Sequence, residues 1–257
     1  MTPSTTNDRN EIRRRLNADR DWSLYALADL DDGMFEHCDW WLHGEGLGLV
    51  FRGLSIRPIF VIGDRGTTAD LLAAMDVPSG YLNLRVEQVD AADGIFAYRD
   101  RHEMQRMLID QLQPRRGETV LLTAADLDDI EALYRTEAGA GFVFAPEQLA
   151  SGFFRGVRKG GELVAIAGVH VVSKAEGVAG VGNIFTRADH RGQGLAQVVT
   201  SAVVEALAKA GIRSIGLNVE CTNIAAIRAY ERIGFRSHFH YFEGTADRVI
   251  KPELTSG

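Results

Sequence analysis

Hydrophobic and polar positions in the second half of the chain predict strands and helices in a regular order. Residues 162–173 and 181–186 are runs of β-branched and small apolar residues, as in buried strands, whereas 195–210 carry apolar residues at helical spacing. The predicted elements, in chain order, are strand 119–123, helix 124–137, a short helix from Pro146, two strands within 152–173 joined by a Gly160-Gly161 turn, strand 181–186, a helix from Gly192 to about Ala210, strand 214–220, helix 223–233 and strand 235–242. This order predicts a mixed α/β fold in which an antiparallel meander leads into one parallel βαβ unit.

The first half is less regular. Its predicted elements are paired strands at 46–53 and 57–63, a helix at 67–75 and a strand at 81–89. Five aromatic residues before them are expected to pack in a core, namely Trp22, Tyr25, Phe35, Trp40 and Trp41. The string LRVEQVDAA at 84–92 parallels LNVECTNIAA at 217–226, and ADLDD occurs at both 28 and 125. The two offsets differ, so the pattern leaves duplication and coincidence open.

A polar stretch containing Pro and Gly, residues 110–120, lies between apolar segments and predicts a domain boundary. We therefore expect domains at 1–113 and 114–257. Charge supports the division. Residues 1–114 contain 12 Arg, no Lys and 19 Asp or Glu, whereas the remainder is neutral, and the formal net charge of the chain is −7. An acidic first half and a neutral second half argue against a nucleic-acid-binding face.

Composition narrows the class of protein further. A content of 46% hydrophobic and 25% charged residues is typical of a soluble globular protein, and we find no apolar run of the roughly 20 residues that span a membrane. The first 15 residues do not have the pattern of a signal peptide, so we expect a cytoplasmic protein. Cys38 and Cys221 lack the spacing of a metal site, and we predict that no metal is bound.

The sequence Arg191-Gly192-Gln193-Gly194 stands where a predicted strand gives way to a helix. A helix that begins after such a turn presents unpaired backbone N–H groups, which together with the helix dipole form a site for an anion such as a pyrophosphate. Glycines let the backbone approach the anion, and an arginine adds a charge-assisted contact. An ordinary tight turn with no ligand is the alternative.

Two other phosphate-binding motifs fit this turn poorly. A dinucleotide-binding G-x-G-x-x-G would need a third glycine where Gln197 stands, although Glu220 does occupy the acidic position after the next strand. A P-loop is absent, because no glycine in the chain is followed by Lys-Ser or Lys-Thr.

A third motif, [Q/R]-x-x-G-x-[G/A], is met by six consecutive residues, Arg191, Gly192, Gln193, Gly194, Leu195 and Ala196. Here the chain resembles the GNAT superfamily of N-acetyltransferases, in which this turn binds the pyrophosphate of acyl-CoA. The string LNVECTNIAAIRAYERIGF resembles the second motif of the family through Asn223, Ala226, Tyr230, Gly234 and Phe235. The resemblance extends from about residue 119 to 235. It is greatest to the glycine N-acyltransferase-like branch, which implies two tandem GNAT-like halves, the first degenerate.

The resemblance implies a role for several residues. Ile184, Phe185 and Thr186 would form the strand edge that hydrogen-bonds the pantetheine arm and the acyl carbonyl, although they also fit a core strand. Asn223 would contact the cofactor, or it only caps its helix. Tyr230 would protonate the departing CoA thiolate, or it is a half-buried core residue.

The general base is not evident from the sequence. Some members of the family carry a Glu where Asn218 stands here; Glu220 lies two residues on and shares its strand face. His170, on a predicted strand, is a second candidate, and a chain of water molecules is a third.

These inferences predict an acyl-CoA-dependent N-acyltransferase that uses acetyl-CoA as co-substrate. The amine acceptor, a small molecule or a peptide, would attack the thioester directly, and strand N–H groups would stabilise the oxyanion. We expect the acceptor to contact residues 137–149 and a cleft between the halves. The alternative is a CoA-binding sensor or interaction module without turnover. The sequence does not determine the identity of the acceptor, the length of the acyl group or the oligomeric state.

Overall fold

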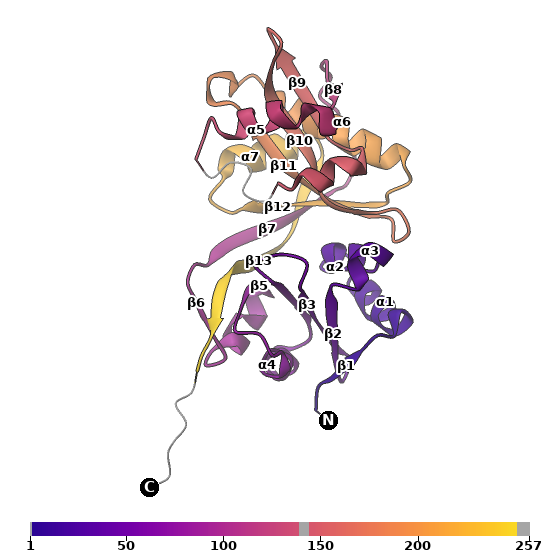
Figure 1. Cartoon of the computed structure of the whole chain (residues 1–257), viewed down its shortest axis with the longest axis vertical. Helices are drawn as coiled ribbons and strands as arrows, with labels where there is room; N and C mark the ends of the chain where they lie inside the picture. Colours follow the sequence, from indigo (N-terminus) through magenta and orange to yellow (C-terminus); the bar gives the residue numbers. More distant parts are fainter. Residues whose placement is uncertain (1, 139–143, 251–257) are drawn as a thin grey trace. The chain divides into compact units, whose positions relative to one another are not determined.

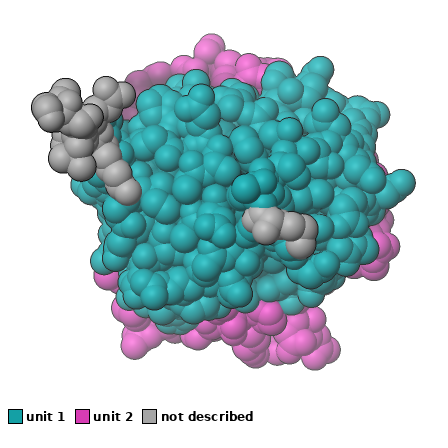
Figure 2. All heavy atoms as spheres, turned by 90° about the horizontal axis from the view of Figure 1, so that it is seen from below, with its two compact units in different colours: residues 1–104, 240–257 teal, residues 105–239 magenta. Residues whose placement is uncertain are grey.

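A computed structural model describes residues 2–138 and 144–250 of the chain. The chain divides into two compact units, which are coloured separately in Figure 2. The first contains residues 1–104 and 240–257, and the second contains 105–239. Within the described ranges, no helix combines the length and the apolar character needed to cross a membrane.

The first unit is a mixed sheet with helices (Figure 1). Its elements are β1 (Ser4–Thr6), α1 (Arg9–Ala18), α2 (Leu24–Ala28), α3 (Asp32–Phe35), β2 (Cys38–His43), β3 (Gly46–Phe51), β4 (Pro58–Ile62), α4 (Arg65–Ala74), β5 (Ser79–Arg85), a 3-10 helix (Val86–Ala92) and β6 (Phe96–Tyr98). Strands β1 to β4 pair antiparallel in sequence order, and β4 and β5 pair in parallel around α4. The predicted strand at 81–89 ends at Arg85, because the backbone turns into the 3-10 helix.

The second unit contains the predicted meander and βαβ unit (Figure 1). Its elements are the later part of β7 (His102–Ile109), β8 (Val120–Leu121), a 3-10 helix (Ala124–Asp126), α5 (Leu127–Tyr134), a 3-10 helix (Pro146–Ser151), β9 (Arg155–Lys159), β10 (Glu162–Ser173), β11 (Val178–Thr186), a 3-10 helix (Ala188–His190), α6 (Leu195–Lys209), β12 (Ser214–Glu220), α7 (Ile224–Arg232) and the first part of β13 (Phe235–Arg248). Strands β8 to β11 are antiparallel neighbours, and β11 and β12 are parallel. The predicted mixed α/β fold is confirmed.

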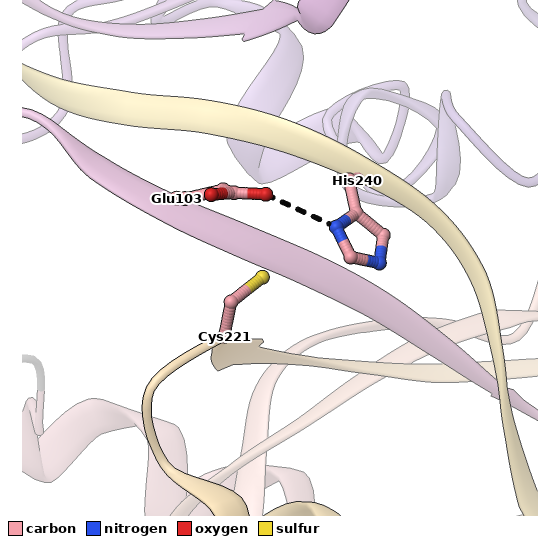
Figure 3. Close-up of side chains that lie close together, drawn as sticks. All are labelled: Glu103, Cys221 and His240. Carbon is pink, nitrogen blue, oxygen red and sulfur yellow. Dashed lines mark hydrogen bonds and ion pairs between the residues drawn. The ribbon is translucent and has the colours of Figure 1, made fainter.

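Strand β13 belongs to both units. Its first residues lie in the second unit, whereas residues 241–247 pair antiparallel with β5 in the first. Glu103 of β7 and His240 of β13 also face each other within the first unit, with Oε1 and Nδ1 3.2 Å apart (Figure 3). The first unit is therefore completed by the last strand of the chain.

The units do not divide at the single boundary predicted near residue 114. The polar stretch 110–120 packs on the second unit instead of linking two domains. The N–H groups of Asp110 and Gln113 donate to the carbonyls of Gly234 and Ile233, at 3.1 and 2.9 Å. A sequence read in order shows the polarity of this stretch but cannot show the backbone partners that hold it down.

Each unit has its own apolar core. In the second unit α6 packs along β9, β10 and β11, and buries Val199, Val203 and Leu207. In the first unit Trp22 and Trp40 are buried, and the indole N–H of Trp22 donates to the carbonyl of Val61 at 3.1 Å. These contacts agree with the prediction that the aromatic residues of the first half pack in a core.

The two units share an order of elements. In the first, β3 and β4 form an antiparallel pair and β4–α4–β5 a parallel βαβ unit; in the second, β10, β11, α6 and β12 repeat this. The string 84–92 begins near the end of β5, whereas the string 217–226 begins in the middle of β12. The shared topology is compatible with duplication, which stays a prediction.

Candidate functional site

The turn between β11 and α6 has the backbone that its glycines predict. Gly192 and Gly194 have φ angles of +77° and +79°, in the left-handed region that side chains with a Cβ rarely adopt. Gly194 is the N-cap of α6, and no side chain caps the helix. The first N–H groups of this 15-residue helix are thus available to an anion, and the helix dipole favours negative charge there.

Arg191 is engaged by groups of the second unit. Its guanidinium forms an ion pair with Glu137, its Nε donates to the carbonyl of Thr186 at 3.1 Å, and it lies over the ring of Phe185. Part of the positive charge that the sequence assigns to this turn is therefore balanced by a carboxylate.

The parallel pairing of β11 and β12 stops partway along both strands. It runs from Val178 opposite Ser214 to Val181 opposite Leu217. Both strands nevertheless continue, β11 to Thr186 and β12 to Glu220. Ile184, Phe185 and Thr186 lie in this continuation and are partly exposed. An extended ligand could therefore hydrogen-bond the β11 backbone here without displacing a paired strand.

Strands β11 and β12 separate close to Asn183, a residue that the sequence analysis did not single out. Asn183 has a φ of +55°, the one positive φ at a non-glycine position within the described ranges, and the register with β10 shifts at this point. The hydroxyl of Tyr134 donates to the carbonyl of Asn183 at 3.1 Å, and the Asn183 amide donates to Oε1 of Gln148 at 2.9 Å. Asparagine is one of the few residues besides glycine that adopt this conformation readily, so its presence in a strand is the signal that the sequence offers.

His170 supports this bulge from the neighbouring strand. Its Nε2 accepts the N–H of Asn183 at 3.2 Å, and its ring fills the space beside Gly182, where a Cβ would come within 2.2 Å of it. Burial lowers the pKa of His170 to about 4. The imidazole is therefore neutral at pH 7 and uses the lone pair of Nε2 inside the fold, which argues against the role of general base.

Tyr230 and Asn223 lie on α7 and at its start. Asn223 is the N-cap, and its Oδ1 accepts the N–H of Ala226 at 3.1 Å. Tyr230 is 8% exposed and contacts the ring of Phe235 edge to face. Burial raises the pKa of the Tyr230 phenol, so it holds its proton throughout the neutral range. Both residues thus have structural roles. The cofactor contact of Asn223 and the proton donation by Tyr230 stay predictions.

The second candidate base, Glu220, is exposed at the end of β12. Asn218, on the same strand, accepts a hydrogen bond from Nε of the buried Arg106 at 2.7 Å. The position at which some family members carry a Glu is thus occupied by an amide held to an arginine.

In the first unit, the corresponding turn lies between β4 and α4, and the side chain of its Asp64 caps the helix. Asp64 caps α4 and accepts the N–H of Thr67 at 2.8 Å; this backbone hydrogen bond is the main cause that lowers the pKa of Asp64. The pocket beside it also contains Arg14 and Glu45, which form an ion pair at 3.1 Å. A carboxylate therefore occupies the place that a phosphate would take.

The segment expected to contact the acceptor is described only in part. Residues 139–143, which belong to it, lie outside the described residues. Of the rest, Phe144 packs against the rings of Tyr134 and Phe154.

Comparison with known proteins finds sequence similarity within the second unit. Residues 119–235 match the model of the acetyltransferase (GNAT) family. Over 143 residues the chain is 27% identical to the [ribosomal protein bS18]-alanine N-acetyltransferase of Escherichia coli K12, covering 50% of this chain and 93% of that protein. Over 164 residues it is 27% identical to the mycothiol acetyltransferase of Streptomyces avermitilis, covering 56% of this chain and 53% of that protein. The matched region thus spans about half the length of the mycothiol acetyltransferase.

A solved structure extends the similarity of fold to both units. An acetyltransferase of the GNAT family from Colwellia psychrerythraea superimposes with a TM-score of 0.60 at 14% identity, covering 97% of this chain and 100% of that chain. The predicted GNAT fold is confirmed, and residues 119–235 are similar in sequence to the acetyltransferase (GNAT) family. The more specific branch named from the sequence stays a prediction.

Proposed function

We propose that this protein is an N-acetyltransferase that moves the acetyl group of acetyl-CoA to an amine. The observation that carries the proposal is the uncapped α6 N-terminus at Gly194, next to the stretch of β11 that continues beyond its pairing with β12. The first feature suits a pyrophosphate and the second an extended pantetheine arm. The similarity of residues 119–235 to the GNAT family supports the same assignment.

In this proposal the backbone N–H groups of 192–196 bind the pyrophosphate. Backbone groups of Ile184, Phe185 and Thr186 bind the pantetheine arm and polarise the acyl carbonyl. Asn223 keeps its capping bond through Oδ1 and uses its amide nitrogen toward the co-substrate. The amine attacks the thioester carbon, the C–S bond breaks, and the thiolate takes the proton of the Tyr230 hydroxyl. Water or Glu220 accepts the proton of the amine.

The acceptor is an amine whose identity we leave open. One relative is named for an alanine of a ribosomal protein and another for mycothiol, so the family match is compatible with peptide and small-molecule acceptors.

The test is an assay of turnover with acetyl-CoA and a panel of peptide and small-molecule amines. The release of free CoA thiol measures the rate. We expect acetylation of at least one class of amine and its loss in Gly194→Asp. Tight CoA binding without turnover on any amine would instead indicate a sensor on the same fold. Absence of CoA binding would refute both functions.

A further inference from the structure

Arg115 lies against the glycine turn at the start of α6, although it belongs to the stretch in which the sequence predicts a domain boundary. A Cβ on Gly194 would come within 2.5 Å of its guanidinium carbon. One terminal nitrogen donates to the carbonyl of Gln193 at 3.4 Å, and the other donates to Oε1 of Gln197 at 3.3 Å. The guanidinium therefore borders directly on the turn to which the proposed function assigns a pyrophosphate.

The backbone around Arg115 is fixed to α6. The N–H of Arg115 donates to Oγ of Ser201 at 3.0 Å, and Gly117 packs so closely on Val198 that a Cβ there would come within 2.7 Å of it. The side chain itself is exposed, and its two hydrogen bonds are at the long end of the usual range. The position is thus held in place while the guanidinium is free to turn toward a ligand.

The charge of Arg115 has no carboxylate partner within residues 2–138 and 144–250. Its hydrogen-bond acceptors there are a carbonyl and an amide, both neutral. The neighbouring Arg116, by contrast, pairs with Glu205 at 2.8 Å, and Arg191 pairs with Glu137. The N-terminus of a helix carries partial positive charge, so a guanidinium beside it is unfavourable unless an anion joins them. Phosphate oxygens would accept two parallel hydrogen bonds from the guanidinium.

We infer that Arg115 is a phosphate-binding residue whose guanidinium contacts the pyrophosphate of CoA alongside the N–H groups of 192–196. The inference rests on the proposed function and adds to it a residue outside the family motif. It assigns Arg115 to the pyrophosphate and not to the 3′-phosphate, because the guanidinium borders Gln193 and Gly194 at the helix start.

Titration calorimetry of the full chain with CoA and with dephospho-CoA, which lacks the 3′-phosphate, tests this assignment. We expect Arg115→Gln to weaken the binding of both ligands by roughly ten- to hundredfold, the usual effect of losing a hydrogen bond to a charged group. Arg115→Lys keeps the charge and should restore part of the loss. Arg116→Gln removes a neighbouring charge that is already paired with Glu205 and should bind both ligands like the wild type.

Each other outcome overturns the inference. Unchanged affinity of Arg115→Gln, with the wild type binding CoA, refutes Arg115 as a ligand and leaves the proposed function standing. A loss for CoA alone assigns the guanidinium to the 3′-phosphate. An equal loss in Arg116→Gln indicates a general charge effect. A lowered melting temperature in Arg115→Gln that Arg115→Lys does not rescue indicates a structural role. No binding by the wild type refutes the proposed function itself.

Discussion

The backbone N–H of Asn183 donates a hydrogen bond to Nε2 of His170 across 3.2 Å. This bond joins β11 to β10 at the point where the register shifts, and it requires a neutral imidazole. Protonation of His170 would place a donor against a donor inside the fold. The acid stability of the protein should therefore depend on this residue.

We predict that the free energy of unfolding falls as the pH is lowered from about 6.5 to about 4. Burial lowers the pKa of His170 from 6.5 to about 4, so between these values the unfolded chain binds more protons than the native state, and stability decreases on acidification. The contribution should be on the order of 1–3 kcal/mol. Urea unfolding across this range should show a smaller decrease in His170→Gln. Equal pH dependence in the two proteins would contradict the assignment.

The positive φ of Asn183 can be tested by a pair of variants. Asn183→Gly and Asn183→Ala both remove the side-chain bond to Gln148, but only alanine is strained at a φ of +55°. We expect Asn183→Ala to be less stable than Asn183→Gly by about 1 kcal/mol. Chemical denaturation of the two proteins measures the difference. If they are equally stable, the bulge relaxes in solution.

Gly194→Asp should abolish CoA binding and leave no second site. The change places a Cβ at a φ of +79° against Arg115 and puts a carboxylate where the pyrophosphate would bind. Gly211→Asp is a matched control, since Gly211 follows the other end of α6 with a φ of +85° and no heavy atom within 4 Å of an added Cβ. Calorimetry should find one site per chain in the wild type and in the control. Two sites would show that the first unit, despite Asp64, also binds CoA.

Tyr230→Phe should lower kcat by on the order of 10²-fold or more while the KM for acetyl-CoA changes little. Phenylalanine keeps the edge-to-face contact with Phe235 but has no proton to donate. Steady-state kinetics with a fixed amine give both constants. A parallel rise in KM would make the hydroxyl a binding group, and unchanged kinetics would remove Tyr230 from the chemistry.

Two fragments should behave differently. Fragment 114–257 lacks Met107, which is fully buried in the core of the second unit, and Arg106, which bonds Asn218. We expect it to aggregate. Fragment 105–239 contains the whole second unit and should stay in solution and bind CoA. Gel filtration and calorimetry compare them. A monomeric, active 114–257 would show that β7 is dispensable.

Much of the second unit is predictable because residues close together in sequence determine its helices, strands and turns. The glycines of the α6 turn, the strand 214–220 and the helix that begins after Asn223 are each determined by neighbouring residues, and they appear where the sequence places them. The same holds for the turn at Gly160-Gly161, where both φ angles are positive.

The features that the sequence analysis missed depend on distant residues. The backbone of Arg115 is held by a hydrogen bond to Ser201, 86 residues further on. The bulge at Asn183 is held by hydrogen bonds to His170 and Tyr134. Helix α1 begins where Asp8 accepts the N–H groups of Asn10 and Glu11, a cap that the sequence analysis overlooked in a polar segment. The first unit is built from two segments that are far apart in sequence, so a single boundary along the chain could not reproduce it.

Strand β13 has a consequence for synthesis on the ribosome. Residues 241–247 supply the antiparallel partner of β5, which is made more than 150 residues earlier. While the second unit emerges, one edge of β5 stays open to solvent and to other chains, and exposed strand edges promote aggregation. The order of translation thus leaves the first unit, although made first, unable to finish folding until the last strand leaves the exit tunnel.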